Sequence, residues 1–224
     1  MPGVRGRGGA VVVAVANLKG GVGKTTTSVH LAAGLALASR PSVLVDLASQ
    51  GSAPAHLIDP PQSGPGVMRV MDGEATLADA LRPTSIDGLR ILPWSGITAG
   101  RDGLWEEGPV DPDFLRTKLH EMAGPEPRYV VVDTPPHLGA LTVAALAAAD
   151  LVIIPVNCEY LPILGLKQFN EALGRMRNHL RLPMRIAGYV LTQVDRRARL
   201  TWEVEEILRR PVAALVFRTM IRSD

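Results

Sequence analysis

The stretch VVVAVANLKGGVGKTTTSVH at residues 11–30 constrains the fold more than any other part of the chain. It begins as a buried strand of valines and alanines, passes through a glycine-rich turn, and continues as a helix from about Lys24. Gly20, Gly21 and Gly23 can adopt backbone angles closed to other residues, so that successive N–H groups can point toward one anion. The N-terminus of the helix adds its positive dipole at the same place. The stretch therefore predicts a phosphate-binding loop between a strand and a helix.

The polar groups of this loop predict binding of ATP and Mg²⁺. Lys24 supplies a point charge for the β- and γ-phosphates, and the hydroxyl of Thr25 is placed to ligate Mg²⁺. A chance glycine turn is the alternative, and the strand before the loop and the helix after it count against that alternative. The residues expected to contact the nucleotide are Lys19, Gly20, Gly21, Val22, Gly23, Lys24, Thr25 and Thr26.

The loop departs from the ordinary pattern G-x-x-x-x-G-K-[ST] at one position. Leu18 stands where the first glycine is expected, and Lys19 precedes the paired glycines. This K-G-G-x-G-K-T-T sequence resembles the deviant Walker A box of the ParA/MinD family of ATPases. The resemblance implies a homodimer with ATP between the subunits, in which Lys19 reaches the partner's ATP and acts in catalysis with Lys24. A solvated loop lysine is the simpler alternative.

The composition is that of a soluble globular protein with an aliphatic core. Of the 224 residues, 46% are hydrophobic, 21% are charged and only 4% are aromatic. The single cysteine, Cys158, excludes an intrachain disulfide and fits a reducing compartment. No apolar run reaches the roughly 18 residues of a membrane span, and MPGVRGRGGA lacks the apolar centre of a signal peptide. We therefore expect a cytoplasmic protein that does not bind membranes.

Hydrophobic runs alternate with helical patterns along the chain. This alternation predicts an α/β fold with a mostly parallel, twisted sheet and helices on both faces. Residues 1–9 are expected to be a disordered Gly/Arg-rich tail, residues 10–224 a single domain, and residues 47–66 a loop. The expected strands begin near residue 10 and lie at 42–46, 89–94, 129–132, 151–157, 184–193 and 213–221. The expected helices lie at 24–39, 76–82, 113–122 (capped by Asp111), 163–180 and 201–210.

Two aspartates directly follow buried strands. Asp46 ends the strand at 42–46 and Asp133 follows the strand at 129–132. Open α/β sheets bind ligands at the carboxyl edge where such strands end. Together with Thr25, the two aspartates form the predicted Mg²⁺ site. The following sequence DTPPHLG resembles the second switch of the ParA/MinD family, D-x-P-P-S-x-G, with His137 in place of the usual serine.

The resemblance to the ParA side of the family extends over residues 10–221. It implies a P-loop NTPase fold, non-specific DNA binding by the ATP-bound dimer, and slow hydrolysis stimulated by a ParB-like or cargo-adaptor protein. The implied role is to position plasmids, chromosomes or protein cargo on the nucleoid. The matching blocks are KGGVGKTTTSVHLAAGLA, VLVDLASQGSA, YVVVDTPPHLGALTVAAL, LVIIPVNCEYLPILGLKQF and GYVLTQVDRRARL.

Two features depart from the family pattern. The first switch usually reads D-L-D-P-Q-G, and its second aspartate orients the attacking water. Ala48 occupies that position here, and its methyl group can neither accept a proton nor position water. We therefore expect impaired hydrolysis with retained nucleotide binding. Relatives also continue past the last strand with an arginine-containing loop and helices, so a truncated end would weaken adenine and DNA contacts.

Arginine is concentrated toward the end of the chain. Residues 175–224 hold 11 arginines and 5 acidic residues, in a chain whose net charge is +2. This asymmetry predicts a polyanion surface, although solvated helix faces explain the same composition. Trp202 is expected either beneath a loop or as an exposed partner contact. The predicted DNA contacts are Arg196, Arg197 and Arg199, with Arg218 and Arg222 as weaker candidates.

Three other function classes compete with a DNA-associated ATPase. A MinD-like membrane regulator needs a C-terminal amphipathic helix, which FRTMIRSD does not provide. An iron–sulfur reductase needs at least two cysteine ligands per subunit, and the chain has only Cys158. A non-hydrolysing, ATP-sensing scaffold is favoured if Ala48 is the natural residue.

Overall fold

The computed structural model describes residues 10–48, 52–58, 64–94, 112–121, 129–158, 162–179, 182 and 184–223. The predicted tail at residues 1–9 and the predicted cap at Asp111 lie outside these residues and remain predictions. Within the described part of the chain, no helix combines the length and the apolar character needed to cross a bilayer.

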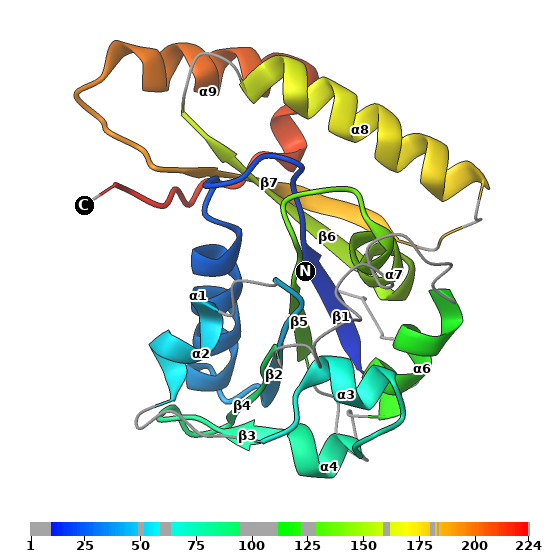
Figure 1. Cartoon of the computed structure of the whole chain (residues 1–224). Helices are drawn as coiled ribbons and strands as arrows, with labels where there is room; N and C mark the ends of the chain where they lie inside the picture. Colours follow the sequence, from blue (N-terminus) through cyan, green and yellow to red (C-terminus); the bar gives the residue numbers. More distant parts are fainter. Residues whose placement is uncertain are drawn as a thin grey trace.

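The described strands form one seven-stranded sheet in the order β3–β4–β2–β5–β1–β6–β7 (Figure 1). All neighbouring pairs are parallel except β3 with β4 at one edge. The predicted mostly parallel sheet is therefore confirmed. The strands are β1 Val11–Val15, β2 Ser42–Asp46, β3 Arg82–Pro83, β4 Leu89–Leu92, β5 Tyr129–Asp133, β6 Leu151–Asn157 and β7 Arg185–Thr192.

Helices connect most of these strands and cover both faces of the sheet (Figure 1). The longest predicted helices form, with ends that differ from the prediction by one or two residues. The described helices are α1 Lys24–Leu37, α2 Ser52–Leu57, α3 Val67–Met71, α4 Leu77–Ala80, α6 Pro112–Glu121, α7 Ala140–Ala148, α8 Pro162–His179 and α9 Arg199–Val212, followed by a 3₁₀ turn at Ala213–Leu215.

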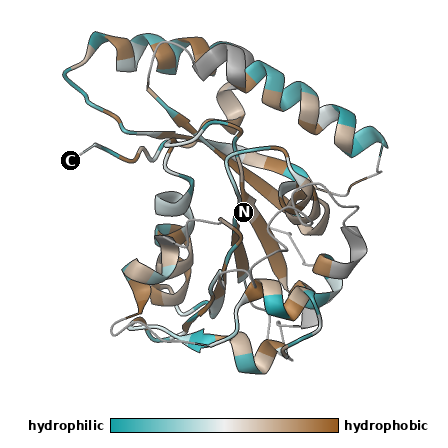
Figure 2. Cartoon of the chain, viewed as in Figure 1, coloured by the Kyte–Doolittle hydropathy of each residue, from teal (hydrophilic) through white to brown (hydrophobic). Residues whose placement is uncertain are grey.

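Successive residues of the central strands pack on opposite faces of the sheet, as the two-residue period of a strand requires. In β5, Val130 and Val132 belong to the larger apolar cluster and Val131 to the smaller one. The smaller cluster includes residues of α1 and α2, and the larger includes residues of α3, α6, α7, α8 and α9. Figure 2 shows the apolar strands in the middle of the fold. Burial on both faces explains why these strands read as unbroken runs of valine and leucine.

The predicted last strand at residues 213–221 is wrong. Ala213–Leu215 form a 3₁₀ turn, and the segment after it follows β7 and the residues beyond β7 with two isolated bridges, Tyr189 with Val216 and Val194 with Arg222. The turn packs directly on Gly188 of β7, where an added Cβ would meet the carbonyl oxygen of Leu215 at 2.5 Å. The segment therefore lies close against β7 without forming a continuous ladder.

Two predictions for the middle of the chain also need correction. Residues 47–66 are not all loop, because α2 begins at Ser52 and buries Ala53 and Leu57 against the smaller cluster. Pro54 does not prevent this helix, since a proline is tolerated in the first turn. The predicted helix at 76–82 is shorter, because Leu81 and the residue before Pro83 are extended.

Candidate phosphate-binding site

The loop between β1 and α1 has the backbone shape that its glycines predict. Gly21 and Gly23 have φ angles of 71° and 78°, in the left-handed region that side chains disfavour. Gly23 precedes α1 directly, and its carbonyl accepts the N–H of Thr27 at 2.9 Å. Among the described residues, no side chain caps the helix at Gly23. The first N–H groups of α1 are therefore available to an anion.

Three side chains hold the carbonyl groups of this loop. Thr192 Oγ1 donates to the Val22 carbonyl at 2.9 Å, and Gln193 Nε2 donates to the Gly21 carbonyl at 2.9 Å. Thr27 Oγ1 donates to the Gly23 carbonyl at 2.7 Å. The C=O and N–H of a trans peptide point in opposite directions. In each of these three peptides, the N–H group therefore points away from the side chain that binds the carbonyl.

Lys24 is a buried cation beside the loop. Its side chain is 8% exposed, and Nζ donates to the carbonyl oxygen of Lys19 at 2.9 Å. Burial lowers the pKa of Lys24, and the nearby charge of Asp133 opposes that shift. A desolvated ammonium of this kind interacts strongly with a phosphate.

Asp133 lies at the end of β5 and contacts the start of α1. Its Oδ2 accepts a hydrogen bond from Thr25 Oγ1 at 2.6 Å, and its Oδ1 accepts one from Ser28 Oγ at 3.1 Å. Burial raises the pKa of Asp133 to about 6, while these hydrogen bonds and the charge of Lys24 act in the opposite direction.

Asp46 is the direct neighbour of Asp133 across the sheet. The register of β2 and β5 pairs the two residues, and both are fully buried. Asp46 Oδ1 accepts the N–H of Ala48 at 3.0 Å, whereas Oδ2 is buried without a hydrogen-bond partner. Burial and repulsion by Asp133 raise the pKa of Asp46 to about 7.

These two carboxylates fit a divalent cation. An orphaned buried carboxylate oxygen beside a second carboxylate and a hydroxyl is a set of hard oxygen donors, which Mg²⁺ prefers. Among the described residues, no group of three or more His, Cys, Asp or Glu side chains could hold a metal ion. The set is thus too small to enclose a cation, and it matches the way Mg²⁺ is held by one or two carboxylates plus phosphate and water.

A cavity of about 590 Å³ opens beside the loop. This volume is in the range of small-molecule and cofactor sites. Its lining joins the loop to the segments after β2, β5 and β7. The lining residues are Gly20, Gly21, Gly23, Lys24, Thr25, Thr26, Ala48, Thr134, Pro136, His137, Thr192, Gln193, Ile221 and Arg222.

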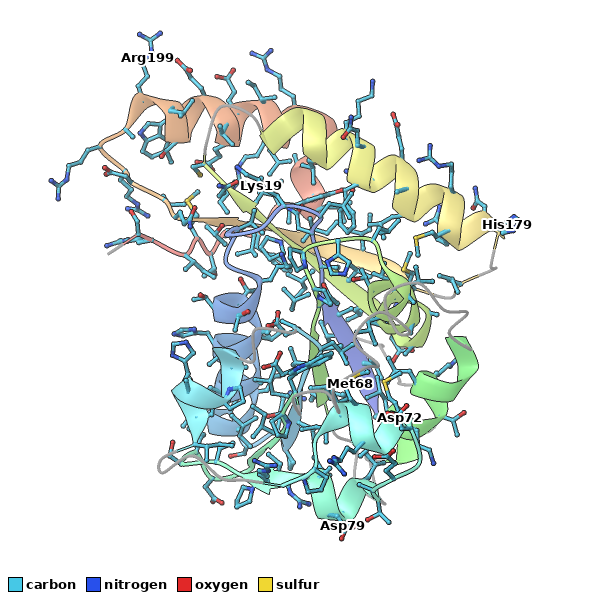
Figure 3. All side chains as sticks on the ribbon, in the orientation of Figure 1. Lys19, Met68, Asp72, Asp79, His179 and Arg199 are labelled. Atoms are coloured by element: carbon cyan, nitrogen blue, oxygen red, sulfur yellow. The ribbon has the colours of Figure 1, made fainter. Side chains whose placement is uncertain are left out.

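The structure brings together most of the residues predicted to form the site, although Asp46 and Asp133 lie behind Thr25 and Ala48 and do not line the cavity. Six of the eight loop residues line the cavity together with Ala48, and Val22 is buried behind them. Lys19 is exposed on the loop (Figure 3) and does not line the cavity. It borders a second hollow of about 190 Å³ with Asn17 and Asn157.

The predicted DNA arginines lie on two neighbouring segments. Arg196 and Arg197 are exposed in the turn before α9, and a bridge between Val194 and Arg222 brings the C-terminal segment beside that turn. Arg199 projects from the start of α9 (Figure 3) and forms an ion pair with Glu203 at 2.9 Å. Arg218 is exposed as well. Arg222 differs from the other four in lining the cavity.

Sequence reasoning missed several residues at this site. Ser28 holds Asp133, and Thr192 and Gln193 hold the loop. Thr192 and Gln193 follow the apolar run of β7, so the rule that found the two aspartates would have found them too. Trp202 is 54% exposed, and its Nε1 donates to the carbonyl of Arg196 at 3.2 Å, while its predicted contact with a partner stays a prediction.

Comparison with known proteins agrees with this geometry. A family model described as an AAA domain matches residues 10–186. The sporulation initiation inhibitor protein Soj of Bacillus subtilis (strain 168) is 35% identical over 212 residues, covering 94% of this chain and 83% of that protein. The chain belongs to the Soj/ParA family of partition ATPases.

Other members and neighbours of the Soj/ParA family support the assignment. The chromosome partitioning protein ParA of Myxococcus xanthus (strain DK1622) is 34% identical, over 94% of this chain and 74% of that protein. Among solved structures, cobyrinic acid a,c-diamide synthase from Mycobacterium smegmatis, with bound ATP analog and magnesium, is similar with a TM-score of 0.79. It is 32% identical, over 90% of this chain and 82% of that chain. The P-loop NTPase fold is therefore confirmed.

Proposed function

We propose that the cavity binds ATP with Mg²⁺. The observation that carries this proposal is a cavity lined by the glycine loop, Lys24 and Thr25, with Asp133 bonded to the Thr25 hydroxyl and Asp46 beside Asp133. The loop N–H groups and the N-terminus of α1 bind the phosphates, and Lys24 neutralises the β- and γ-phosphates. Thr25, Asp46 and Asp133 hold Mg²⁺, directly or through water. The Mycobacterium smegmatis neighbour, which binds an ATP analog and magnesium, supports the same ligands here.

ATP binding in turn drives dimerisation in this proposal. Lys19 lies outside the cavity of its own subunit, at the exposed surface of the same loop. From there it reaches the phosphates bound by the partner subunit of a homodimer. Pro136, His137 and Leu138 are also exposed, and the first two line the cavity, so this segment lies beside the loop.

The ATP-bound dimer binds DNA without sequence preference and acts in partition. The exposed Arg196, Arg197 and Arg218 supply phosphate contacts, together with Arg199, whose exposed ion pair costs little to open. Arg222 lines the cavity, and in this proposal it contacts the nucleotide and not DNA. A ParB-like or cargo-adaptor protein activates the dimer, which moves plasmid, chromosome or protein cargo on the nucleoid. The partition role rests on the Soj and ParA relatives.

Hydrolysis is slow in this chain because Ala48 lacks the carboxylate that orients water. Ala48 lines the cavity beside the loop, where such a group would act. The same residue favours a second candidate function, in which the protein is an ATP-sensing scaffold that holds its dimer without turnover. The two functions share the nucleotide site and differ in whether an activator releases the dimer.

Nucleotide-dependent DNA binding tests the proposal. Fluorescence anisotropy of a labelled random duplex should rise with protein in Mg-ATP and remain low in Mg-ADP. A Lys24→Ala variant should fail to bind DNA in either nucleotide. Equal DNA binding with ATP, with ADP and without nucleotide would contradict the switch. Strong preference for one duplex sequence would contradict the partition role.

A further inference from the structure

Gln193 has a backbone conformation that its place in the chain does not explain. Among the described non-glycine residues, Ser39 and Gln193 alone have positive φ, at 57° and 53°. Ser39 follows the last turn of α1, where a left-handed residue commonly closes a helix. Gln193 instead follows a strand. A left-handed conformation costs a non-glycine residue free energy, so the surrounding contacts must hold it.

The contact that accompanies this conformation reaches the phosphate loop. Gln193 Nε2 donates to the carbonyl of Gly21 at 2.9 Å, across 172 positions of sequence. The residues on either side are held as well. Thr192 Oγ1 donates to the Val22 carbonyl, and the N–H of Val194 donates to the Ile221 carbonyl at 3.1 Å. Gln193 thus lies between two anchored neighbours, and it lines the same cavity as Gly21.

The acceptor is the part of the loop that most needs to be held. Gly21 has a φ of 71°, no side chain, and open space where a Cβ would stand. A glycine in this setting can rotate its peptide plane more freely than other residues. Once the carbonyl of Gly21 is held, the N–H of Val22 is fixed in the opposite direction.

We propose that Gln193 is a positioning residue for phosphate binding, which aims the Val22 N–H by holding the Gly21 carbonyl. The inference rests on the proposed triphosphate site. This contact preorganises the loop, because the peptide between Gly21 and Val22 is already oriented before the ligand binds. The predicted effect is on affinity for the phosphate chain, whether or not a base is attached to it.

Calorimetry with Mg²⁺ and either ATP or inorganic tripolyphosphate tests this role. Gln193→Met keeps the length and the Cβ, so its backbone cost is similar while the donor is lost. We expect affinity for both ligands to fall by about 3- to 10-fold, the effect of one hydrogen bond. Gln193→Gly, which also relieves the backbone, should lose affinity by a similar factor. The control Asn178→Met, which also replaces a carboxamide and lies at an exposed position of α8, should bind both ligands as the parent does.

The outcomes separate this inference from the proposed function. A folded Gln193→Met variant, shown by an unchanged melting temperature, that binds tripolyphosphate as tightly as the parent overturns the positioning role alone. Loss of affinity for ATP but not for tripolyphosphate also overturns it, because the contact would then be to the nucleoside. If the methionine variant does not fold, the glycine variant decides by the same criteria. A parent protein that binds neither ligand overturns both proposals.

Discussion

In the proposed function, Ala48 is the residue that most affects what this site does after ATP binds. Phosphoryl transfer to water depends on positioning the water and on stabilising charge at the γ-phosphate. Lys24, Thr25 and the loop amides can still provide the second of these. The group expected to position the water is missing, because Ala48 lines the cavity where its carboxylate would act.

Restoring the carboxylate should therefore restore turnover. A positioned general base contributes about 10²- to 10⁴-fold. We expect Ala48→Asp to raise phosphate release by at least about tenfold, a conservative floor for that range, with ATP affinity nearly unchanged. Brisk hydrolysis in the parent that is unaltered by the aspartate would show that another group positions the water.

Asp46 gives a prediction for pH and stability. Burial and Asp133 raise its pKa to about 7, well above the value of an unfolded aspartate. The folded state then binds more protons than the unfolded state between about pH 4 and 7, so nucleotide-free stability falls as pH rises through this window. Asp46→Asn removes that charge and should raise the free energy of unfolding at pH 8 by about 1–3 kcal/mol.

Urea denaturation at pH 5 and pH 8 measures this effect. The gain from Asp46→Asn should be smaller at pH 5, where the parent carboxyl is protonated. The same variant should lose most of the Mg²⁺ dependence of ATP binding, since an amide is a weaker ligand for Mg²⁺. An asparagine variant that is less stable than the parent at pH 8 would show that Asp46 has a stabilising partner.

At the scale of elements, the segment from β7 to α9 connects the proposed nucleotide site to the proposed DNA surface. The end of β7 holds the phosphate loop, and the next residues form the arginine-bearing turn. The carbonyl of Asp195 accepts the N–H of Ala198 at 3.1 Å and the hydroxyl of Thr201 at 2.8 Å, which fixes this turn to α9. These hydrogen bonds hold the backbone from which the arginines project.

Arg197 tests whether this turn contacts DNA. The logarithm of affinity should fall with the logarithm of salt concentration by about 0.9 for each phosphate contact. Arg197→Ala should weaken binding to all duplexes alike and reduce that slope by about 1. Arg90→Ala, at an exposed position of β4, is the matched control and should leave the slope unchanged. An unchanged slope in Arg197→Ala would move the DNA surface to another part of the molecule.

The same elements show what the sequence could and could not predict. Continuous apolar runs and the glycine loop predicted the parallel sheet and the position of Asp133, because both follow from local periodicity and strand ends. The segment after α9 reads as a strand, but its path depends on Gly188 meeting the backbone of Leu215, a contact between distant residues. The hydrogen bond from Gln193 to Gly21 was missed for the same reason. Local patterns predict elements, while such long-range contacts are set by the tertiary structure.

At the scale of the whole molecule, we propose that the oligomeric state depends on the bound nucleotide. Each subunit provides a cavity and, on the exposed part of the loop outside it, Lys19. Lys19→Ala should therefore weaken dimerisation in ATP by at least about tenfold, the effect of losing one charged contact to a phosphate of about 1.5–3 kcal/mol. Sedimentation velocity over a concentration series measures that shift. A variant that dimerises as well as the parent would limit Lys19 to a role within its own subunit.

The most direct test of the switch is the mass of the unmodified protein in each nucleotide. Light scattering after gel filtration should give the mass of a dimer in Mg-ATP and of a monomer in Mg-ADP, relative to a chain of 23.9 kDa. Because hydrolysis is predicted to be slow, the dimer should persist through the run, and the nucleotide recovered from it should be intact ATP. A single mass that is the same in saturating ATP, in ADP and without nucleotide would contradict the account.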